Sequence, residues 1–282
     1  MQDGTAVLLI DCPDRKGLVA SVSGLLYAHG ANIIHADQHQ DDEAGLFFMR
    51  VEWSLDGFEV DSFRAEFEPI AAGFGMRWRL EMSDRVPRVA IFASHELHCL
   101  VDLLYRHQTG EIHCDIPLII GNHRDAESLA GYYKIPFHYS PTTKESQEVE
   151  RKQLALLRDA GVQLIVLARY MQILSPEFTN TYPGAIINVH HSFLPAFIGA
   201  KPYHQAFERG VKLIGSTSHY VTAGLDDGPI IEQDVMRVSH RDQVKDLVEK
   251  GRDLERVVLS RAVRWHLEHR ILRYANKTVV FD

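Results

Sequence analysis

The sequence predicts an α/β protein built from two domains, and three observations point to it. The chain has 282 residues, more than one hydrophobic core usually needs. Residues 5–82 space their apolar side chains in the order strand, helix, strand, strand, helix, strand. After a polar segment with a proline at 83–88, short apolar runs alternate with helical patterns, which is typical of a mainly parallel sheet. We therefore place a first domain at 1–83 and a second at 88–282.

Two residue spacings define the elements of the first domain. Val7–Asp11 is an apolar run, and residues 18–26 then carry leucine and valine at helical spacing up to Gly30, which is suited to ending a helix. Apolar side chains alternate with polar ones over 47–53 and 76–82, and a helical pattern lies between these two strands. The order is that of a ferredoxin-like βαββαβ sandwich.

The second domain opens with short apolar runs that predict strands at 88–93, 116–121, 136–139, 162–168 and 185–190. Thr142 and Glu145 match a capping box at the start of a helix. The runs at 213–221 and 229–238 are joined by a short Gly/Asp loop, which favours antiparallel pairing, and 252–269 predicts a long helix. Parallel sheets of this kind bind ligands outside the carboxyl ends of their strands.

Composition and charge argue against several classes of protein. The formal net charge is -8 with both signs interspersed, so we do not expect the basic face of a nucleic-acid-binding protein. No apolar run reaches the length of a membrane span, and the N-terminal run is too short for a secretory signal. Cys12, Cys99 and Cys114 are odd in number and lack Cys-x-x-Cys spacing. This usage indicates reduced thiols in a cytoplasmic protein.

Three polar residues form the candidate catalytic centre. Asn188 and His190 project from the same face at the end of a predicted strand, because strand side chains alternate. An amide donor beside an imidazole suits a carbonyl oxygen that becomes an oxyanion under attack. Asp226 lies in a glycine-containing loop from which a carboxylate could pair with His190. Each part alone has a plainer explanation: an ordinary strand end, a turn, and for His191 a local hydrogen bond.

The run INVHHSFLP, the later LDDGPII and the upstream LARYMQILSP together resemble the folate-dependent formyltransferase family, from Arg88 to the C-terminus. The resemblance implies a Rossmann-like domain in which Asn188, His190 and Asp226 are catalytic, with Asp227 a loop residue and no metal or redox cofactor. It also implies a folate pocket formed by Met171, Gln172, Ile173, Leu174, Gly224 and Leu225. From the residue pattern alone, the segment 171–174 also fits simple core packing.

The N-terminal segment DCPDRKGLVASVSGLLYAHGANI resembles an ACT domain, a small module that often binds amino acids between paired copies. The resemblance implies regulatory positions at Asp14, Gly17, Gly30 and Asn32 and an amino-acid effector. A dimerisation module without a ligand is an equal alternative. We expect a homo-oligomer, because ACT-like domains pair and a small exposed sheet would leave its edges unprotected.

An ACT-like domain fused to a formyltransferase-like domain, with HHSFLPAFIGAKPYHQAFERG and the ending NKTVVF, resembles the formyltetrahydrofolate deformylase family. The resemblance implies hydrolysis of 10-formyltetrahydrofolate to formate and tetrahydrofolate, which supplies formate for purine biosynthesis and balances the folate pool. Two alternatives stay open: transfer of the formyl group to a small amine, and a ligand sensor without turnover.

The segment IFASHELHCLVDLL bears on the amine alternative. It has no glycine, and Glu96 would repel the phosphate of a phosphorylated amine, although His95 and His98 would compensate in part. Two histidines three apart also raise the question of zinc. The spacing is not His-Glu-x-x-His, so we expect no metal site here. An RNA substrate is disfavoured by the acidic charge and by the early end of the chain after its long helix.

Overall fold

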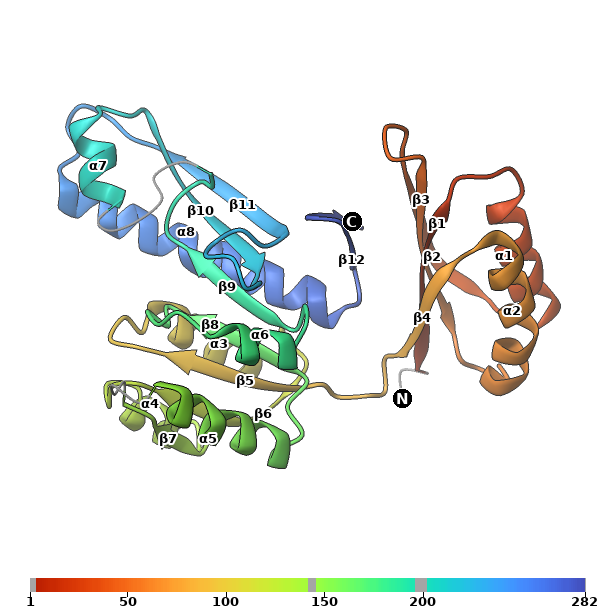
Figure 1. The fold of residues 1–282 in the computed structure, drawn as a ribbon, viewed down its shortest axis with the longest axis horizontal. Coiled ribbons are helices and arrows are strands. Elements are labelled where there is room, and N and C mark those ends of the chain that lie inside the picture. Colours follow the sequence, from red (N-terminus) through yellow and green to blue (C-terminus); the bar gives the residue numbers. More distant parts are fainter. Residues whose placement is uncertain (1–3, 142–145, 196–201, 282) are drawn as a thin grey trace. The chain divides into compact units, whose positions relative to one another are not determined.

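The fold is described from a computed structural model, which covers residues 4–141, 146–195 and 202–281 (Figure 1). The chain divides into two compact units. The first comprises 1–86, 268–274 and 278–282, and the second comprises 87–267 and 275–277.

The first unit is a four-stranded antiparallel sheet with two helices on one face. Its elements are β1 (Thr5–Pro13), α1 (Leu18–Ala28), β2 (Ile33–Asp41), β3 (Leu46–Ser54), α2 (Val60–Phe74) and β4 (Arg77–Met82). The strand order is β2-β3-β1-β4. Trp53, Phe63 and Phe67 are fully buried in the core between helices and sheet. The predicted order βαββαβ is confirmed, as is Gly30 after α1, with a positive φ of 72°.

The C-terminal segment packs on the opposite face of this sheet. A hairpin of β12 (Ile271–Tyr274) and β13 (Lys277–Val280) buries Leu272 and Phe281 against Phe48. The Tyr274 hydroxyl donates to Asp41 at 2.9 Å. The sequence-based boundary assigned all residues up to 282 to the second domain, and the hairpin itself was not predicted. Strands of four residues are too short to show a clear alternation, so packing on the sheet decides their place.

The second unit is built on a seven-stranded sheet of order β11-β10-β9-β8-β5-β6-β7. Its strands are β5 (Arg88–Ala93), β6 (Asp115–Gly121), β7 (Phe137–Tyr139), β8 (Leu164–Ala168), β9 (Ile186–His190), β10 (Leu213–Tyr220) and β11 (Ile230–Arg237). Its helices are α3 (His98–Gln108), α4 (Glu127–Tyr132), α5 (Ser146–Asp159), α6 (Pro176–Thr181), α7 (Pro202–Glu208) and α8 (Val244–Leu267). Strands β5 to β9 are parallel, and β10 pairs antiparallel with β11, both as predicted. β10 also pairs antiparallel with β9, which was not predicted. The predicted capping box at Thr142 and Glu145 lies outside the described residues.

The long helix α8 begins at Val244, eight residues before the predicted start at 252. Gly251 interrupts the apolar pattern in its first half, yet Leu247 and Leu254 on either side are buried. A side-chain carbon at Gly251 would overlap the phenol ring of Tyr203. The glycine is therefore a close-approach position inside the helix rather than a sign of a loop.

The strand order of this sheet, which can be followed in Figure 1, predicts where a ligand binds. The chain runs outward from β5 through β6 to β7 and then returns to β8 on the other side of β5. The crevice outside the carboxyl ends of strands at such a reversal is where ligands bind in α/β sheets. α8 lies against β9, β10 and β11 on one face, and α5 and α6 contribute Leu157 and Phe178 to the core on the other.

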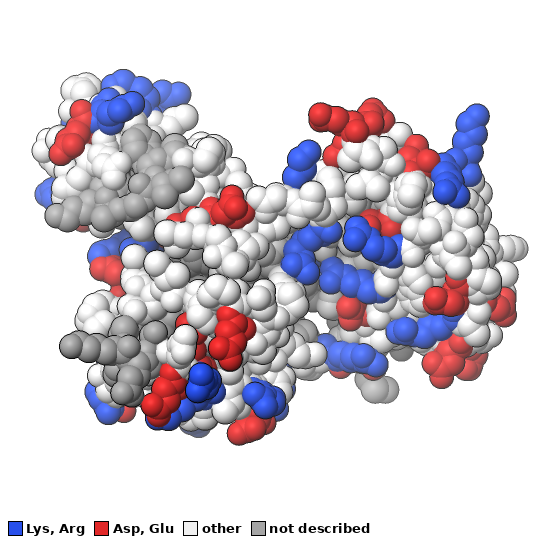
Figure 2. Space-filling model, in the orientation of Figure 1, with Lys and Arg blue, Asp and Glu red and all other residues white. Residues whose placement is uncertain are grey.

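Charges of both signs are mixed over the surface of each unit, as Figure 2 shows for one face. Among the described residues, no helix is both long and apolar enough to span a membrane.

Candidate active site

The end of β9 carries the two polar side chains that were expected to share a site. Asn188 and His190 are two positions apart in the strand, so their side chains lie on the same face. Both line one cavity of about 810 Å³, together with Asp226 from the loop between β10 and β11. Cavities of this size are typical of small-molecule sites. The structure thus brings the three predicted catalytic residues together.

His190 is buried and is held through one ring nitrogen. Its Nδ1 lies 3.1 Å from Oδ2 of Asp226. Since a carboxylate only accepts hydrogen bonds, Nδ1 carries a hydrogen. The other nitrogen, Nε2, is buried and has no hydrogen-bond partner among the described residues. A buried polar atom in this state is costly unless a ligand partners it, so Nε2 is the atom available to a substrate.

The loop that carries Asp226 is folded tightly. Asp226 itself has a positive φ of 52°, a conformation that aspartate tolerates better than most residues. Two positions later, a side-chain carbon at Gly228 would overlap the carbonyl oxygen of Tyr220. Only glycine fits there, and the loop turns back directly over the end of β10. Asp227, the neighbouring acid, is exposed and does not line the cavity.

Electrostatics keep Asp226 ionised. Hydrogen bonds from His190 and His219 hold the pKa of Asp226 well below its usual range, although burial by itself would raise it. A carboxylate with so low a pKa is a poor proton acceptor at neutral pH. Its negative charge instead accepts the hydrogen bond from His190 Nδ1 and fixes the orientation of the ring.

His219 is a site residue that the sequence analysis missed. It lies on β10 directly opposite Asn188 in the antiparallel register, and it is almost fully buried. Its Nε2 is 3.3 Å from Nδ2 of Asn188 and 3.5 Å from Oδ1 of Asp226. The Asn188 amide has two hydrogens and at most one of them can point to His219, so at least one remains for a substrate oxygen.

The predicted folate-binding residues line the same cavity. Met171, Gln172, Ile173, Leu174, Gly224 and Leu225 all contribute to its wall. Leu174 is buried, whereas Met171, Ile173 and Leu225 are 56%, 76% and 64% exposed. Simple core packing, the plainer explanation of the segment, therefore holds for Leu174 alone. Three large exposed apolar side chains around one cavity mark a surface suited to a flat apolar ligand.

A second group of charged and polar residues lines the cavity and was also not foreseen. Glu255 of α8 is buried, and it accepts hydrogen bonds from Nε2 of His98 at 2.7 Å and from the Tyr203 hydroxyl at 2.8 Å. Arg169, just after β8, lies 3.4 Å from Glu255 through Nε and 2.8 Å from Nδ1 of His191 through Nη1. Residues 98, 169 and 255 are far apart in the chain, so no local motif could reveal the group.

The segment His95-Glu96-Leu97-His98 does not present both histidines on one helix face. His98 is the first residue of α3, whereas His95 lies in the loop before it. Glu96 lines the cavity, but it is paired with Arg252 at 2.8 Å. His98 donates a hydrogen bond to Glu255 through Nε2. Cys99, beside it, has a pKa raised well above its ordinary value, chiefly by burial, so it stays a thiol.

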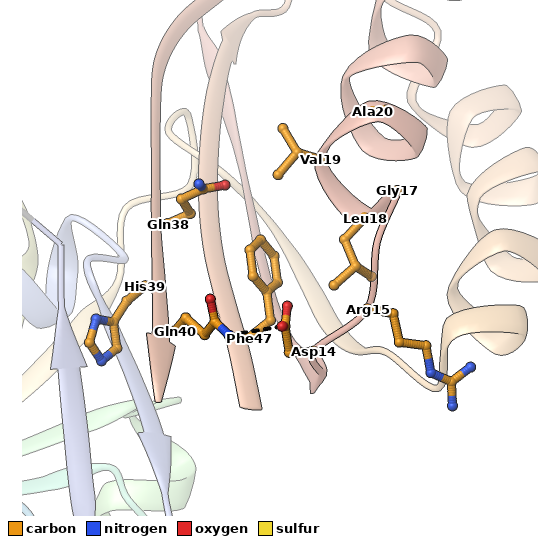
Figure 3. A pocket seen from close by; sticks show the side chains of 10 residues that line it. All are labelled: Asp14, Arg15, Gly17, Leu18, Val19, Ala20, Gln38, His39, Gln40 and Phe47. Atoms are coloured by element: carbon orange, nitrogen blue, oxygen red, sulfur yellow. Dashed lines mark hydrogen bonds between the residues drawn. The ribbon is translucent and has the colours of Figure 1, made fainter. Parts of the chain in front are cut away.

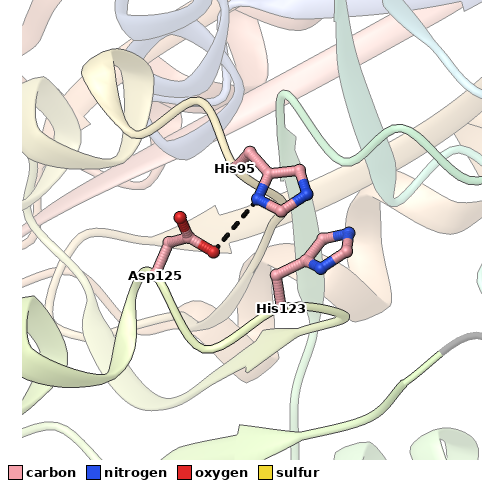
Figure 4. A group of neighbouring side chains, drawn as sticks. All are labelled: His95, His123 and Asp125. Atoms are coloured by element: carbon pink, nitrogen blue, oxygen red, sulfur yellow. Dashed lines mark hydrogen bonds and ion pairs between the residues drawn. The ribbon is translucent and has the colours of Figure 1, made fainter.

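His95, His123 and Asp125 gather at the ends of β5 and β6 and offer donors of the kind that bind transition metals (Figure 4). The two imidazole rings, however, are stacked with centroids 3.5 Å apart and planes only 24° apart. A metal lies in the plane of each ligating ring at about 2.0–2.1 Å from nitrogen, and two nearly parallel planes do not meet there. In this arrangement the group fits ring stacking and an ion pair of His95 with Asp125 at 3.1 Å.

The first unit has a cavity of about 450 Å³ between the start of α1 and strands β2 and β3 (Figure 3). Asp14 and Gly17 line it, and Asp14 accepts a hydrogen bond from Gln40 at 2.9 Å. Gly30 and Asn32 do not line it. They lie beyond the other end of α1, about 16 Å away along the helix axis, where Gly30 ends the helix. The structure thus separates the four predicted regulatory positions into two pairs.

The three cysteines are free and buried. Burial raises the pKa of Cys12 to about 11 and that of Cys114 to about 12. None of them is a thiolate at neutral pH, so none is suited to nucleophilic catalysis.

Comparison with known proteins places this geometry in a family. Residues 87–263 match the formyl transferase family, and residues 6–55 match the ACT domain. A formyltetrahydrofolate deformylase of Synechocystis sp. is 55% identical, with 100% of both chains covered. A deformylase of Bacillus subtilis is 53% identical over 98% of this chain and 93% of that one.

A solved structure agrees with these relatives. The crystal structure of a formyltetrahydrofolate deformylase from Pseudomonas syringae has a TM-score of 0.96 and 49% identity to this chain. The similarity covers 99% of this chain and 95% of the other, so it includes both units. The chain belongs to the formyltetrahydrofolate deformylase family.

Proposed function

We propose that the chain hydrolyses 10-formyltetrahydrofolate to formate and tetrahydrofolate, with Asn188, His190 and Asp226 as its catalytic residues. The observation that carries the proposal is the buried, unpartnered Nε2 of His190. Among the described residues only Asp226 and the neighbouring ring of His191 contact the His190 imidazole in this way, and His190 lines the cavity beside Asn188. A formyl oxygen placed between them receives two hydrogen bonds.

The reaction follows from these contacts. A water oxygen attacks the formyl carbon, and the charge that develops on the formyl oxygen is stabilised by Asn188 Nδ2–H and His190 Nε2–H. The tetrahedral intermediate then collapses as the bond between carbon and N10 breaks. One proton of the water ends on N10, and the formic acid that is released ionises to formate. Donors of this kind each contribute about 100–1,000-fold in rate.

Asp226 acts on the reaction through His190. Its low pKa keeps a full negative charge 3.1 Å from Nδ1, and this charge orients the ring and stabilises it while Nε2 donates to the formyl oxygen.

The apolar rim of the cavity supports a folate as the substrate. Met171, Ile173 and Leu225 expose large apolar surfaces around a cavity whose floor holds the polar trio. A folate has a flat apolar benzoyl ring bonded to N10, and this N10 must reach the trio. Burying each of these side chains under a ligand contributes about 1.5–3 kcal/mol.

Transfer to a phosphorylated amine is disfavoured by the other side of the cavity. Arg252 and Arg169 are both paired with carboxylates there, namely Glu96 and Glu255. The phosphate of such an amine would have to compete with these carboxylates for the arginine side chains.

One assay separates hydrolysis from transfer and from a sensor without turnover. The chain is supplied with 10-formyltetrahydrofolate, with and without a candidate amine, and formate release is measured. We expect formate at the same rate in both. Tetrahydrofolate that forms only when the amine is present, without formate, would support the transferase, and binding without either product would support the sensor.

We also propose that an amino acid binds the cavity of the first unit. The first-turn N–H groups of α1 can donate hydrogen bonds to the carboxylate of the amino acid. The carboxylate of Asp14 can accept hydrogen bonds from its ammonium group (Figure 3). Phe47 and Val19 supply an apolar wall. Calorimetry with single amino acids tests this, and Asp14→Asn should abolish the heat of binding without changing formate release.

Pairing of two copies through β2 is our proposal for the oligomer. β2 is an edge strand, and it leaves Ile33 and Ile34 38% and 57% exposed. A second copy would pair this edge and cover both side chains. Light scattering should give at least a dimer, and Ile34→Glu should dissociate it. We place this enzyme in the cytoplasm, where the formate that it releases would serve purine biosynthesis.

A further inference from the structure

His191 has a defined tautomer. Its Nδ1 lies 2.8 Å from Nη1 of Arg169, and a guanidinium can only donate. Nδ1 therefore accepts, and in the neutral ring the hydrogen is on Nε2. Among the described residues none forms a hydrogen bond with Nε2, and the residue lines the cavity.

His191 is also held neutral by its surroundings. Burial, then the positive charges of Arg169 and His190, lower the pKa of His191 to about 4, while the carboxylates of Glu255 and Asp226 oppose this only in part. Tyr203, a further neighbour with a titratable group in the described part of the chain, has its ring centroid 6.1 Å away. At neutral pH the ring therefore has one hydrogen, on Nε2, and it has no free lone pair, because Nδ1 is engaged by Arg169.

Arg169 is fixed by the network around Glu255. Burial raises the pKa of Glu255, but the hydrogen bond from His98 and the charge of Arg169 bring it below its ordinary value, so the carboxylate is charged. Arg169 has a positive φ of 60°, a strained backbone conformation in a residue other than glycine. Such a backbone persists only where the surrounding contacts determine it, which points to a role for this side chain.

The loop that carries His191 is held equally firmly. The Ser216 hydroxyl donates to the carbonyl oxygen of His190 at 3.0 Å, and the Thr217 hydroxyl donates to that of Ser192 at 2.9 Å. The rings of His190 and His191 lie side by side in the cavity wall, with centroids 5.1 Å apart. One ring serves the formyl oxygen, and the other faces the same space as a pure hydrogen-bond donor.

We propose that His191 selects water over amines as the nucleophile, with Arg169 as the positioning residue that fixes its tautomer. The inference rests on the proposed hydrolysis. A water oxygen has two lone pairs, so one can attack the formyl carbon while the other accepts a hydrogen bond from His191 Nε2–H. An amine nitrogen has one lone pair, which attack consumes, and its own hydrogens would then face the hydrogen of His191.

The bonds balance in both cases. With water, a C–O bond forms, the C–N10 bond breaks, and one water proton passes to N10. With an amine, a C–N bond forms, the same C–N10 bond breaks, and one amine proton passes to N10. The donor at His191 favours only the first route.

The test is a competition between water and hydroxylamine, whose nitrogen is unprotonated near neutral pH. The chain is given 10-formyltetrahydrofolate and a fixed concentration of hydroxylamine, and the ratio of formohydroxamate to formate is measured. We expect His191→Ala to lower the rate of formate release about tenfold and to raise this ratio at least about tenfold. The exposed His240 supplies the matched control, because His240→Ala should leave both quantities unchanged.

Once the reaction without enzyme has been subtracted from both products, the ratio is independent of the amount of folded enzyme, so partial misfolding cannot produce the expected result. An unchanged ratio in His191→Ala, with normal formate release by the unmodified chain, overturns this inference and leaves the proposed hydrolysis intact. If the unmodified chain releases no formate, both this inference and the proposed hydrolysis are overturned.

The tautomer has its own readout. Nitrogen-15 NMR at pH 7 should show His191 with its hydrogen on Nε2. In Arg169→Met we expect a mixture of the two His191 tautomers and a raised pKa of His191. A hydrogen on Nδ1 in the unmodified chain would contradict the role of Arg169.

Discussion

Oδ2 of Asp226 lies 3.1 Å from Nδ1 of His190, although the two residues are 36 positions apart. Aspartate reaches this position because its loop takes a left-handed backbone and Gly228 folds against Tyr220. The contact fixes three things at once: the orientation of the imidazole, the hydrogen on Nδ1, and the charge beside it. It leaves Nε2 as the working atom.

Asp226→Asn should remove the charge while keeping the size of the side chain. We expect kcat to fall about 100–10,000-fold, because the neutral amide no longer stabilises the His190 ring while it donates to the formyl oxygen. KM should change little, since the apolar rim is untouched. Asp227→Asn is the matched control, because that neighbouring acid is exposed and outside the cavity. Near-normal hydrolysis by Asp226→Asn would refute the assignment.

The sequence was sufficient to predict that Asn188 and His190 share a site, because both belong to one strand and alternation is a local property. Asp226 needed the resemblance to a family, since a loop of glycine and aspartate is ambiguous on its own. His219 could not be foreseen. Its place opposite Asn188 depends on the register of two strands, and register is set by tertiary packing.

Substitution of His219 should change how hydrolysis depends on pH. His219 provides one of the two hydrogen bonds that lower the pKa of Asp226. In His219→Asn the pKa of Asp226 should rise toward its ordinary value of 3.8. Because activity requires the ionised carboxylate, it is lost as pH falls through this pKa, so the acidic limb of kcat should move to higher pH. An unmoved acidic limb would show that His219 does not act through Asp226.

Leu225→Ala should weaken substrate binding. Leu225 is 64% exposed at the rim of the cavity, and a bound folate would cover it. Loss of this contact should raise KM about tenfold and leave kcat nearly unchanged, because the rim does not touch the reacting atoms. Val101 on α3 is exposed and does not line the cavity, so Val101→Ala is the control. A fall in kcat instead of a rise in KM would place Leu225 in the chemistry.

Gly251→Ala should destabilise the second unit. The added carbon would overlap the ring of Tyr203, which donates to the buried Glu255. We expect the free energy of unfolding to fall by about 1–3 kcal/mol in chemical denaturation. Gly131 in α4 has open space around it, so Gly131→Ala should be neutral or stabilise by up to about 1 kcal/mol. Equal effects at both positions would contradict the close packing of Gly251.

The presence of helices and strands was predicted better than the residues at which they end and the residues that they contact. The strands at 88–93 and 213–220 have strong local patterns, and the structure reproduces them nearly to the residue. α8 was predicted too short because Gly251 breaks a pattern that only Tyr203 explains. Arg169 and Glu255 escaped notice for a similar reason, since 86 positions separate them and only the fold pairs their charges.

Hydrolysis in water enriched in oxygen-18 tests the central claim most directly. If water attacks the formyl carbon at this site, formate released from 10-formyltetrahydrofolate should contain one labelled oxygen per molecule, and Asp226→Asn should suppress the labelled product. Formate without the label, or labelled formate formed at an unchanged rate by Asp226→Asn, would contradict the account.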